Sequence, residues 1–267
     1  MNNIEIANQT IKITNDKYYM LGDRKIKLLP LNFASVEVIS PESSIALAEK
    51  YSNMHKKGKM CSFKVTNEDS FQAAHRYDKP FVMNFANAHH AGGGFRLGAN
   101  AQEEALCRCS TLYSSIQSDE AKVMYRYNNT HLGRVESDYM LLSTDVCVFR
   151  DEKCNLLESP FQAAVITVPA PNRRGAAIIA SKSFVAETMT RRIRNMLSTA
   201  AERRYKNLIL GAWGCGAFGN SAADVSGYFH KVLVDEEFGS LFDEVCFAVY
   251  SKPDGKNITE FRKMFKA

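Results

Sequence analysis

A run of glycines followed by carboxylates contains the residue types best suited to chemistry. Three consecutive glycines are followed, after seven residues, by an amide and two carboxyl groups: Gly92, Gly93, Gly94, Gln102, Glu103 and Glu104. Glycine adopts positive φ readily and lets the backbone approach a ligand closely, so the amide donors of such a loop can hold an anion. A carboxyl group beside that anion can act as an acid. The pattern therefore predicts a phosphate-bearing ligand and acid catalysis.

The two carboxylates are expected to have different roles. Asn100 could cap the following helix, and Glu103 at the third helical position would then complete a capping box, which is a purely structural alternative for Glu103. Glu104 has no such capping role. Consecutive helical residues diverge by about 100°, so one carboxyl group could hold a sugar hydroxyl while the other protonates a leaving oxygen. Burial would raise the pKa of such a glutamate and keep its proton available near neutrality.

A second glycine loop, residues 214–219, follows a predicted strand over 208–212. Its G-x-G-x-x-G spacing is that of a dinucleotide fingerprint. A Rossmann domain carries this turn after its first strand, whereas only one predicted strand follows here, which argues against a nicotinamide cofactor. The loop amides could still bind a phosphate before a helix capped by Asn220 or Ser221. A tight turn without a ligand is the alternative.

Apolar segments of strand length alternate with amphipathic segments along most of the chain. Strands are predicted at 62–66, 81–86, 145–149, 164–168, 208–212 and 245–250, and helices at 42–54, 70–77, 101–109, 183–204, 222–234 and 257–265. Such alternation indicates a parallel or mixed sheet covered on both faces. We therefore predict a three-layer α/β/α sandwich. Both glycine loops would then lie at the carboxyl ends of strands, where open α/β sheets bind ligands.

Two segments depart from this alternation. Residues 1–60 are more polar and are expected to form a helical N-terminal extension packed on a catalytic domain formed by residues 61–267. Residues 117–139 are polar and weakly patterned, which predicts a long surface loop or lid.

Composition narrows the class of protein. The 267 residues, 45% of them hydrophobic, can form a full core, and no window approaches the roughly 20 apolar residues of a membrane span. The net charge of +5 is compatible with an anionic ligand. Seven cysteines without a C-x-x-C pair, and six histidines without a metal-binding motif, predict no metal, no cofactor and a reducing intracellular compartment. His89 and His90 border the glycine loop, where exposed side chains are the simpler interpretation.

A set of short motifs occurs in a specific order from about residue 63 onwards. The set comprises Asn84-Phe85-Ala86-Asn87, Gly92-Gly93-Gly94, Gln102-Glu103-Glu104, Leu106-Cys107-Arg108, Ser137-Asp138-Tyr139-Met140, Val148-Phe149-Arg150-Asp151, Pro169-Ala170-Pro171-Asn172 and the stretch from Gly211 to Asn220. Each motif alone is weak, but the ordered set resembles the bacterial-type poly(ADP-ribose) glycohydrolases, which have a macrodomain fold.

The resemblance implies an exo-type hydrolase that cuts ribose–ribose O-glycosidic bonds in poly(ADP-ribose) and releases ADP-ribose. It implies that Glu104 is the general acid, that Glu103 binds ribose hydroxyls and that Gln102 holds the catalytic loop. Asn87 would orient the distal ribose, and Phe218 would pack on the terminal ribose. The diphosphate would be clamped by two loops, through Gly92, Gly93, Gly94, Gly214, Cys215, Gly216 and Ala217.

Functions other than poly(ADP-ribose) hydrolysis are compatible with the same motifs. In the animal-type branch an acid stands where this chain has Asn84, so no charge-dependent role transfers to that position. Removal of a single ADP-ribose from protein or nucleic acid is one alternative. Non-catalytic ADP-ribose binding is another, and the paired glutamates argue against it. We expect a monomeric cytoplasmic protein, or a nuclear one in a eukaryote, with ADP-ribosylated macromolecules as partners, no membrane and no stable nucleic-acid partner.

Overall fold

A mixed seven-stranded sheet forms the centre of the molecule. The computed structural model describes residues 1–267 except 31, 55–58, 60, 132, 134 and 267. The strand order is β3-β6-β7-β5-β8-β9-β4. The strands are β3 (Glu37–Ile39), β4 (Ser62–Thr66), β5 (Phe81–Ala86), β6 (Met140–Arg150), β7 (Leu156–Pro169), β8 (Asn207–Leu210) and β9 (Glu244–Ala248). The pairs from β7 to β4 are parallel, whereas β3–β6 and β6–β7 are antiparallel.

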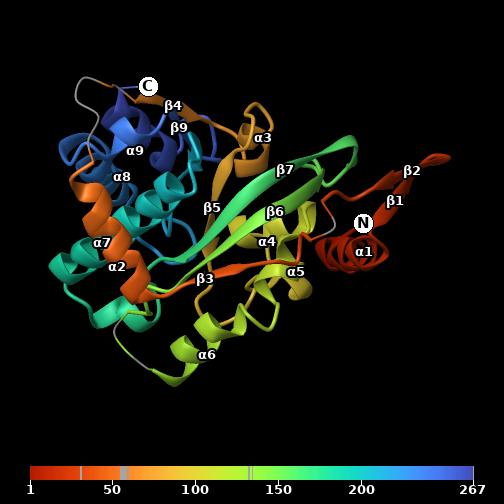
Figure 1. The fold of residues 1–267 in the computed structure, drawn as a ribbon, viewed down its shortest axis with the longest axis horizontal. Coiled ribbons are helices and arrows are strands. Elements are labelled where there is room, and N and C mark those ends of the chain that lie inside the picture. Colours follow the sequence, from red (N-terminus) through yellow and green to blue (C-terminus); the bar gives the residue numbers. More distant parts are fainter. Residues whose placement is uncertain (31, 55–58, 60, 132, 134, 267) are drawn as a thin grey trace.

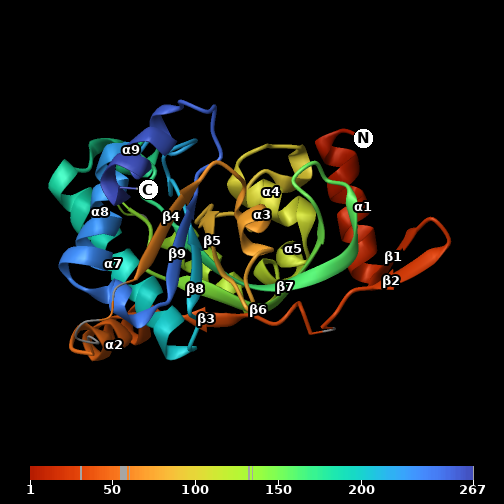
Figure 2. The ribbon, with the colours of Figure 1, turned by 90° about the horizontal axis from the view of Figure 1, so that it is seen from above.

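Helices cover both faces of this sheet (Figures 1 and 2). One layer contains α2 (Pro41–Ser52), α7 (Lys182–Glu202), α8 (Ala222–His230) and α9 (Lys256–Phe265), and the other contains α1 (Asn3–Asp16), α3 (Ser70–Ala74), α4 (Gln102–Cys109), α5 (Leu112–Ile116) and α6 (Lys122–Thr130). Alternate residues of β5 enter different cores, since Phe81 and Met83 pack towards the first layer and Val82 towards the second. The predicted three-layer α/β/α sandwich with a mixed sheet is confirmed.

Short helical turns connect several of these elements. They are η1 (Phe95–Leu97), η2 (Ala176–Ile179), η3 (Lys231–Asp235) and η4 (Phe238–Leu241). The π-helical turn η3 continues α8, so the helix predicted over 222–234 changes its hydrogen-bond pattern near its end. No described helix is long and apolar enough to cross a membrane.

The N-terminal segment was predicted to be helical, but it also contains strands. A hairpin of β1 (Tyr18–Leu21) and β2 (Arg24–Lys27) follows α1, and β3 pairs with β6 in the main sheet. These strands were missed because they are three or four residues long and β2 is mostly charged. The division into residues 1–60 and 61–267 stays a prediction, with the qualification that β3 contributes an edge strand to the central sheet.

The polar segment 117–139 also differs from its prediction. Helix α6 occupies Lys122–Thr130, and Met124 and Tyr125 on it are buried against the second core. The prediction of a long loop or lid was therefore wrong for this stretch. The apolar positions of this segment are too sparse to predict a helix from the sequence. Packing of a few side chains against the core decides the conformation instead.

Candidate functional site

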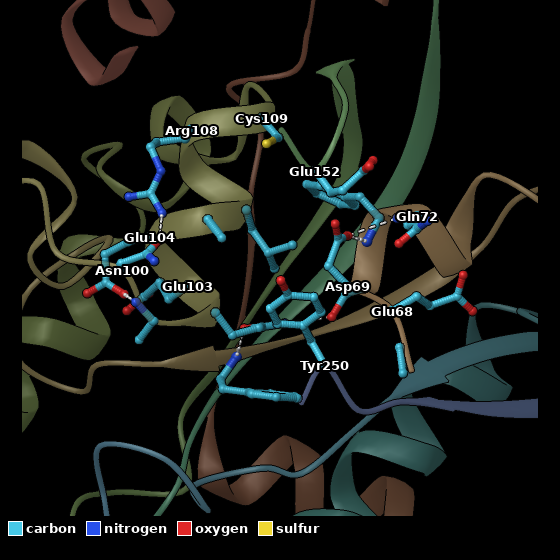
Figure 3. Close-up of a pocket in the computed structure, with 18 of the residues that line it drawn as sticks. Glu68, Asp69, Gln72, Asn100, Glu103, Glu104, Arg108, Cys109, Glu152 and Tyr250 are labelled. Carbon is cyan, nitrogen blue, oxygen red and sulfur yellow. Dashed lines mark hydrogen bonds between the residues drawn. The ribbon is translucent and has the colours of Figure 1, made fainter. Parts of the chain in front are cut away.

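A cavity of about 880 Å³ lies where the parallel strands β5, β8 and β9 end. Its wall includes residues from β5, α4 and the loops after β8 and β9, among them Phe85, Asn87, Gln102, Glu103, Glu104, Gly214, Gly216, Ala217, Phe218 and Tyr250. Figure 3 shows Glu103 and Glu104 beside Asn100, with Arg108 and Cys109 farther along the same helix. The carboxyl ends of the strands thus bring the two carboxylates and the second glycine loop into one site.

The start of α4 is shifted by one residue from the prediction. Ala101 is the N-cap residue, so Glu104 occupies the third helical position and its Oε2 accepts a hydrogen bond from the Ala101 amide at 3.1 Å. The expected cap, Asn100, instead accepts a hydrogen bond from Arg108 Nη2 at 2.5 Å. The buried guanidinium of Arg108 needs acceptors and occupies the Asn100 oxygen. The capping contact therefore belongs to Glu104 and not to Glu103.

Gln102 joins the first turn of α4 to the end of β5. Its Oε1 accepts a hydrogen bond from the Phe85 amide at 2.8 Å. Its Nε2 donates to Met83 O at 2.8 Å and to Ser70 Oγ at 3.0 Å. These three bonds fix the helix N-terminus, and with it the two following glutamates, against the strand end.

Glu103 is held in a buried, hydrogen-bonded position. Its Oε2 accepts from the Asn87 amide at 2.8 Å, and its Oε1 accepts from Asn84 Nδ2 at 3.2 Å. Asn84 Nδ2 also donates to Thr167 Oγ1 at 3.1 Å, on the neighbouring strand β7. Burial raises the pKa of Glu103 to about 8, although the bonds from Asn87 and Asn84 oppose this shift. The raised pKa favours the protonated form of Glu103 near neutral pH.

The first glycine loop holds the carboxylates. Gly94 N–H donates to Glu104 Oε1 at 2.9 Å. Gly93 N–H donates to His90 O at 3.0 Å. The amides of Gly93 and Gly94 thus have protein acceptors in this structure, and the expectation that Gly92, Gly93 and Gly94 hold an anionic ligand stays a prediction.

The second glycine loop contributes backbone amides to the cavity wall. Among the described residues, none accepts a hydrogen bond from the amides of Gly216, Ala217 or Phe218, and all three residues line the cavity. Cys215 differs from these three residues, because its amide donates to Ala212 O at 3.0 Å. Its thiol lies 3.7 Å from Trp213 O. The loop is thus a candidate anion site through these amides, and the expected ligand-binding roles of Gly214 and Cys215 stay predictions.

The helix after this loop starts as the sequence suggested. Ser221 is the N-cap residue of α8, and its Oγ accepts from the Asp224 amide at 3.4 Å. Asn220 supports the loop itself, because its Nδ2 donates to Pro171 O at 2.9 Å and to Gly214 O at 3.2 Å. A Cβ at Gly214 would meet Asn220 Nδ2 at 2.6 Å, so the glycine is required there.

Several cavity residues were not singled out from the sequence. Tyr250 follows β9 at the same sheet edge, and 80% of its side-chain surface is exposed. Glu68, Asp69 and Gln72 follow β4 and lie across the view from α4 in Figure 3. Each of these residues follows a strand of the sheet. Because parallel strands place their carboxyl ends together, this position in the sequence could have predicted that they line the cavity.

Glu103 makes stability depend on pH. Its folded pKa of about 8 lies above its ordinary value of 4.5, so the folded protein binds the proton more tightly than the unfolded chain does. The resulting stability is complete below about 4.5 and is lost as pH rises through about 8. Between those values the melting temperature of the unmodified protein should fall relative to that of Glu103→Gln, as measured by calorimetry. A difference that stays constant with pH would contradict the raised pKa.

Known proteins place this site in a family. The family model described as "Microbial-type PARG, catalytic domain" matches residues 7–151. The solved poly(ADP-ribose) glycohydrolase from Thermomonospora curvata is 32% identical, with 98% of each chain covered and a TM-score of 0.92. The same enzyme bound to the inhibitor ADP-HPD matches with a TM-score of 0.89, at the same identity and coverage.

A second solved relative gives the same assignment. The poly(ADP-ribose) glycohydrolase from Deinococcus radiodurans in complex with ADP-ribose is 33% identical, with 90% of this chain and 98% of that chain covered and a TM-score of 0.82. No curated protein sequence matches this chain. The matched segment contains β5, the glycine loop and α4, and the structural match extends over almost the whole molecule. The chain therefore belongs to the microbial-type poly(ADP-ribose) glycohydrolase family.

Proposed function

We propose that this glycohydrolase removes ADP-ribose units from the end of poly(ADP-ribose), with Glu104 as the acid–base group. The observation that carries the proposal is the pair of buried carboxylates at the start of α4, in the same cavity as three free amides of the second glycine loop. A diphosphate bound by those amides would place an attached ribose along the cavity towards α4. The relatives solved with ADP-ribose and ADP-HPD support a ligand of this kind.

Glu104 is suited to transfer a proton to the leaving oxygen. Its two oxygens accept from the Gly94 and Ala101 amides, which fix the carboxyl group in one orientation at the cavity wall. In the proposed reaction Glu104 protonates the ribose oxygen that leaves, and the resulting carboxylate then takes a proton from the attacking water.

Glu103 is proposed to bind the ribose whose bond breaks. A protonated carboxyl group can donate a hydrogen bond to a sugar oxygen as well as accept one. Asn84 and the Asn87 amide hold it in place, so its role is to position the sugar against Glu104. Phe218 is half-buried at the loop end and is proposed to pack on the terminal ribose.

Product analysis tests the proposed function. Purified poly(ADP-ribose) labelled in the adenine is incubated with the protein, and the products are separated by length at early times. Monomeric ADP-ribose as the first product supports exo cleavage, whereas oligomers as the first products contradict it. A protein mono-ADP-ribosylated on a side chain serves as the parallel substrate. Faster release from that substrate than from the polymer would favour mono-ADP-ribosyl hydrolysis instead.

A further inference from the structure

Two cysteines far apart in sequence meet on the cavity wall, away from the carboxylates. Cys109 is the last residue of α4, and Cys154 lies in the turn between β6 and β7. Both residues line the cavity, and each thiol is among the groups that shift the pKa of the other. Cys109 Sγ also lies 3.3 Å from Asp151 O in the same turn. Of the pair, Cys109 is buried and Cys154 is partly exposed.

The turn brings Cys154 to its partner at a conformational cost. Cys154 has φ +64°, a left-handed conformation that glycine or asparagine adopts more readily. The turn is fixed by Asp151, whose Oδ1 accepts from the amides of Lys153 at 2.9 Å and Asn155 at 2.7 Å. The Cys154 amide itself donates to Asp151 O at 2.9 Å. A cysteine therefore stands where a simple turn would favour another residue.

The surroundings of Cys154 favour its thiolate form. The Cys109 thiol is the largest cause that lowers the pKa of Cys154, and the guanidinium charges of Arg108 and Arg150 add to it. Both guanidinium groups are buried, and Arg150 Nη1 donates to Cys154 O at 2.7 Å. A thiolate that is partly exposed, near fixed cations and beside a second thiol is the usual setting of a redox-reactive cysteine.

The other partly exposed cysteines lack these features. Burial raises the pKa of Cys61 and of Cys215 to about 12 in each case, which keeps both as thiols. Neither has a cysteine as a hydrogen-bond partner within the described part of the chain. Cys61 and Cys215 are therefore internal controls for any reaction at Cys154.

We propose that Cys154 and Cys109 form an oxidation site in which a peroxide converts the two thiols to an intramolecular disulfide. The Cys154 thiolate attacks one oxygen of hydrogen peroxide, the O–O bond breaks, and hydroxide leaves as Cys154 becomes a sulfenic acid. The Cys109 thiol then loses its proton to the released hydroxide, which becomes water, and its sulfur attacks the sulfenic acid and displaces a second hydroxide, which takes the proton that Cys154 gave to solvent. The two sulfurs lose two electrons in total, and the peroxide is reduced to two waters.

The disulfide would connect two walls of the functional cavity. It would join the C-terminal end of α4 to the β6–β7 turn, next to Arg108. That guanidinium also donates to Ala99 O at 2.6 Å and to Asn100, just before the turn that carries Glu103 and Glu104. The oxidised site is therefore in contact with the segment that positions the carboxylates, and a dithiol reductant restores the free thiols.

Peptide mapping of the full-length protein tests this site. The reduced protein is treated with equimolar hydrogen peroxide, unfolded, alkylated and digested. We expect a cross-linked pair of peptides containing Cys109 and Cys154, with the other five cysteines alkylated. Failure to form this cross-link, or formation of links that involve Cys61 or Cys215 at the same rate, would overturn the proposal. Because this readout uses the unmodified chain, it does not depend on the folding of any variant.

Matched variants define the order of the steps. Cys109→Ser should stop at a sulfenic acid on Cys154 that a dimedone probe captures, and Cys61→Ser should form the same disulfide as the unmodified protein. Cys154→Ser should leave Cys109 reduced under the same conditions. Capture of the sulfenic acid on Cys109 rather than Cys154 would contradict the assigned nucleophile.

Discussion

Glu104→Gln is expected to slow poly(ADP-ribose) hydrolysis by about 10²- to 10⁴-fold, the usual contribution of a positioned acid–base group. The amide has nearly the size of the carboxyl group but cannot transfer the proton. Binding of ADP-ribose should be nearly unchanged, because the proposed diphosphate donors, the amides of Gly216, Ala217 and Phe218, are on another loop. Single-turnover kinetics and calorimetric titration with ADP-ribose measure the two effects separately.

Glu103→Gln is the matched control for this variant. The raised pKa of Glu103 favours its neutral form, and an amide at this position is also neutral. We expect a smaller loss of turnover, together with weaker substrate binding if Glu103 holds the ribose. Equal losses in the two variants would show that the carboxylates share the proton transfer, and a larger loss in Glu103→Gln would assign the acid to Glu103.

Gly93→Ala is expected to reduce turnover on the order of 10²-fold, the cost of displacing a catalytic group by about 1 Å. A Cβ at this position would lie 2.5 Å from Glu104 Oε1 and 3.3 Å from Glu103 Oε2. Gly93 also has φ +54°, a conformation that disfavours alanine. The added methyl group therefore pushes on both carboxylates at once. Steady-state kinetics on the polymer measure the effect.

Gly22→Ala separates the two consequences of the Gly93 substitution. Gly22 has φ +58° in the β1–β2 hairpin, and a Cβ there would meet no atom within 4 Å. It should lose stability through backbone strain alone and keep its turnover per folded molecule. If Gly93→Ala loses only stability, to the same extent as Gly22→Ala, then close contact with the carboxylates is not what requires this glycine.

Much of the fold followed from local sequence patterns. Strand β5 was predicted with its observed bounds, because burial on both faces leaves an almost continuous apolar run. Strand β7 was predicted too short. Its first half is half-buried or exposed and contains Glu158, so its pairing with β6 leaves little pattern in the sequence.

The site was only partly predictable for a related reason. The sequence indicated that Gly92 to Gly94 and the two glutamates act together, but it made no distinction between binding a ligand and the hydrogen bond that Gly94 N–H donates to Glu104. That distinction depends on a one-residue shift of the helix start. The shift follows from Arg108, whose guanidinium takes the Asn100 oxygen, and such a tertiary contact leaves no trace in local propensity.

The two glycine loops therefore have different roles in our account. The first orients Glu103 and Glu104, and the second is proposed to bind the diphosphate. A structure of the Glu104→Gln variant with ADP-ribose tests this division most directly. We predict diphosphate oxygens within hydrogen-bond distance of the Gly216, Ala217 and Phe218 amides, with C1 of the terminal ribose facing the side chain at position 104. Diphosphate bound to the amides of Gly92 to Gly94, or a terminal ribose turned away from α4, would contradict the account.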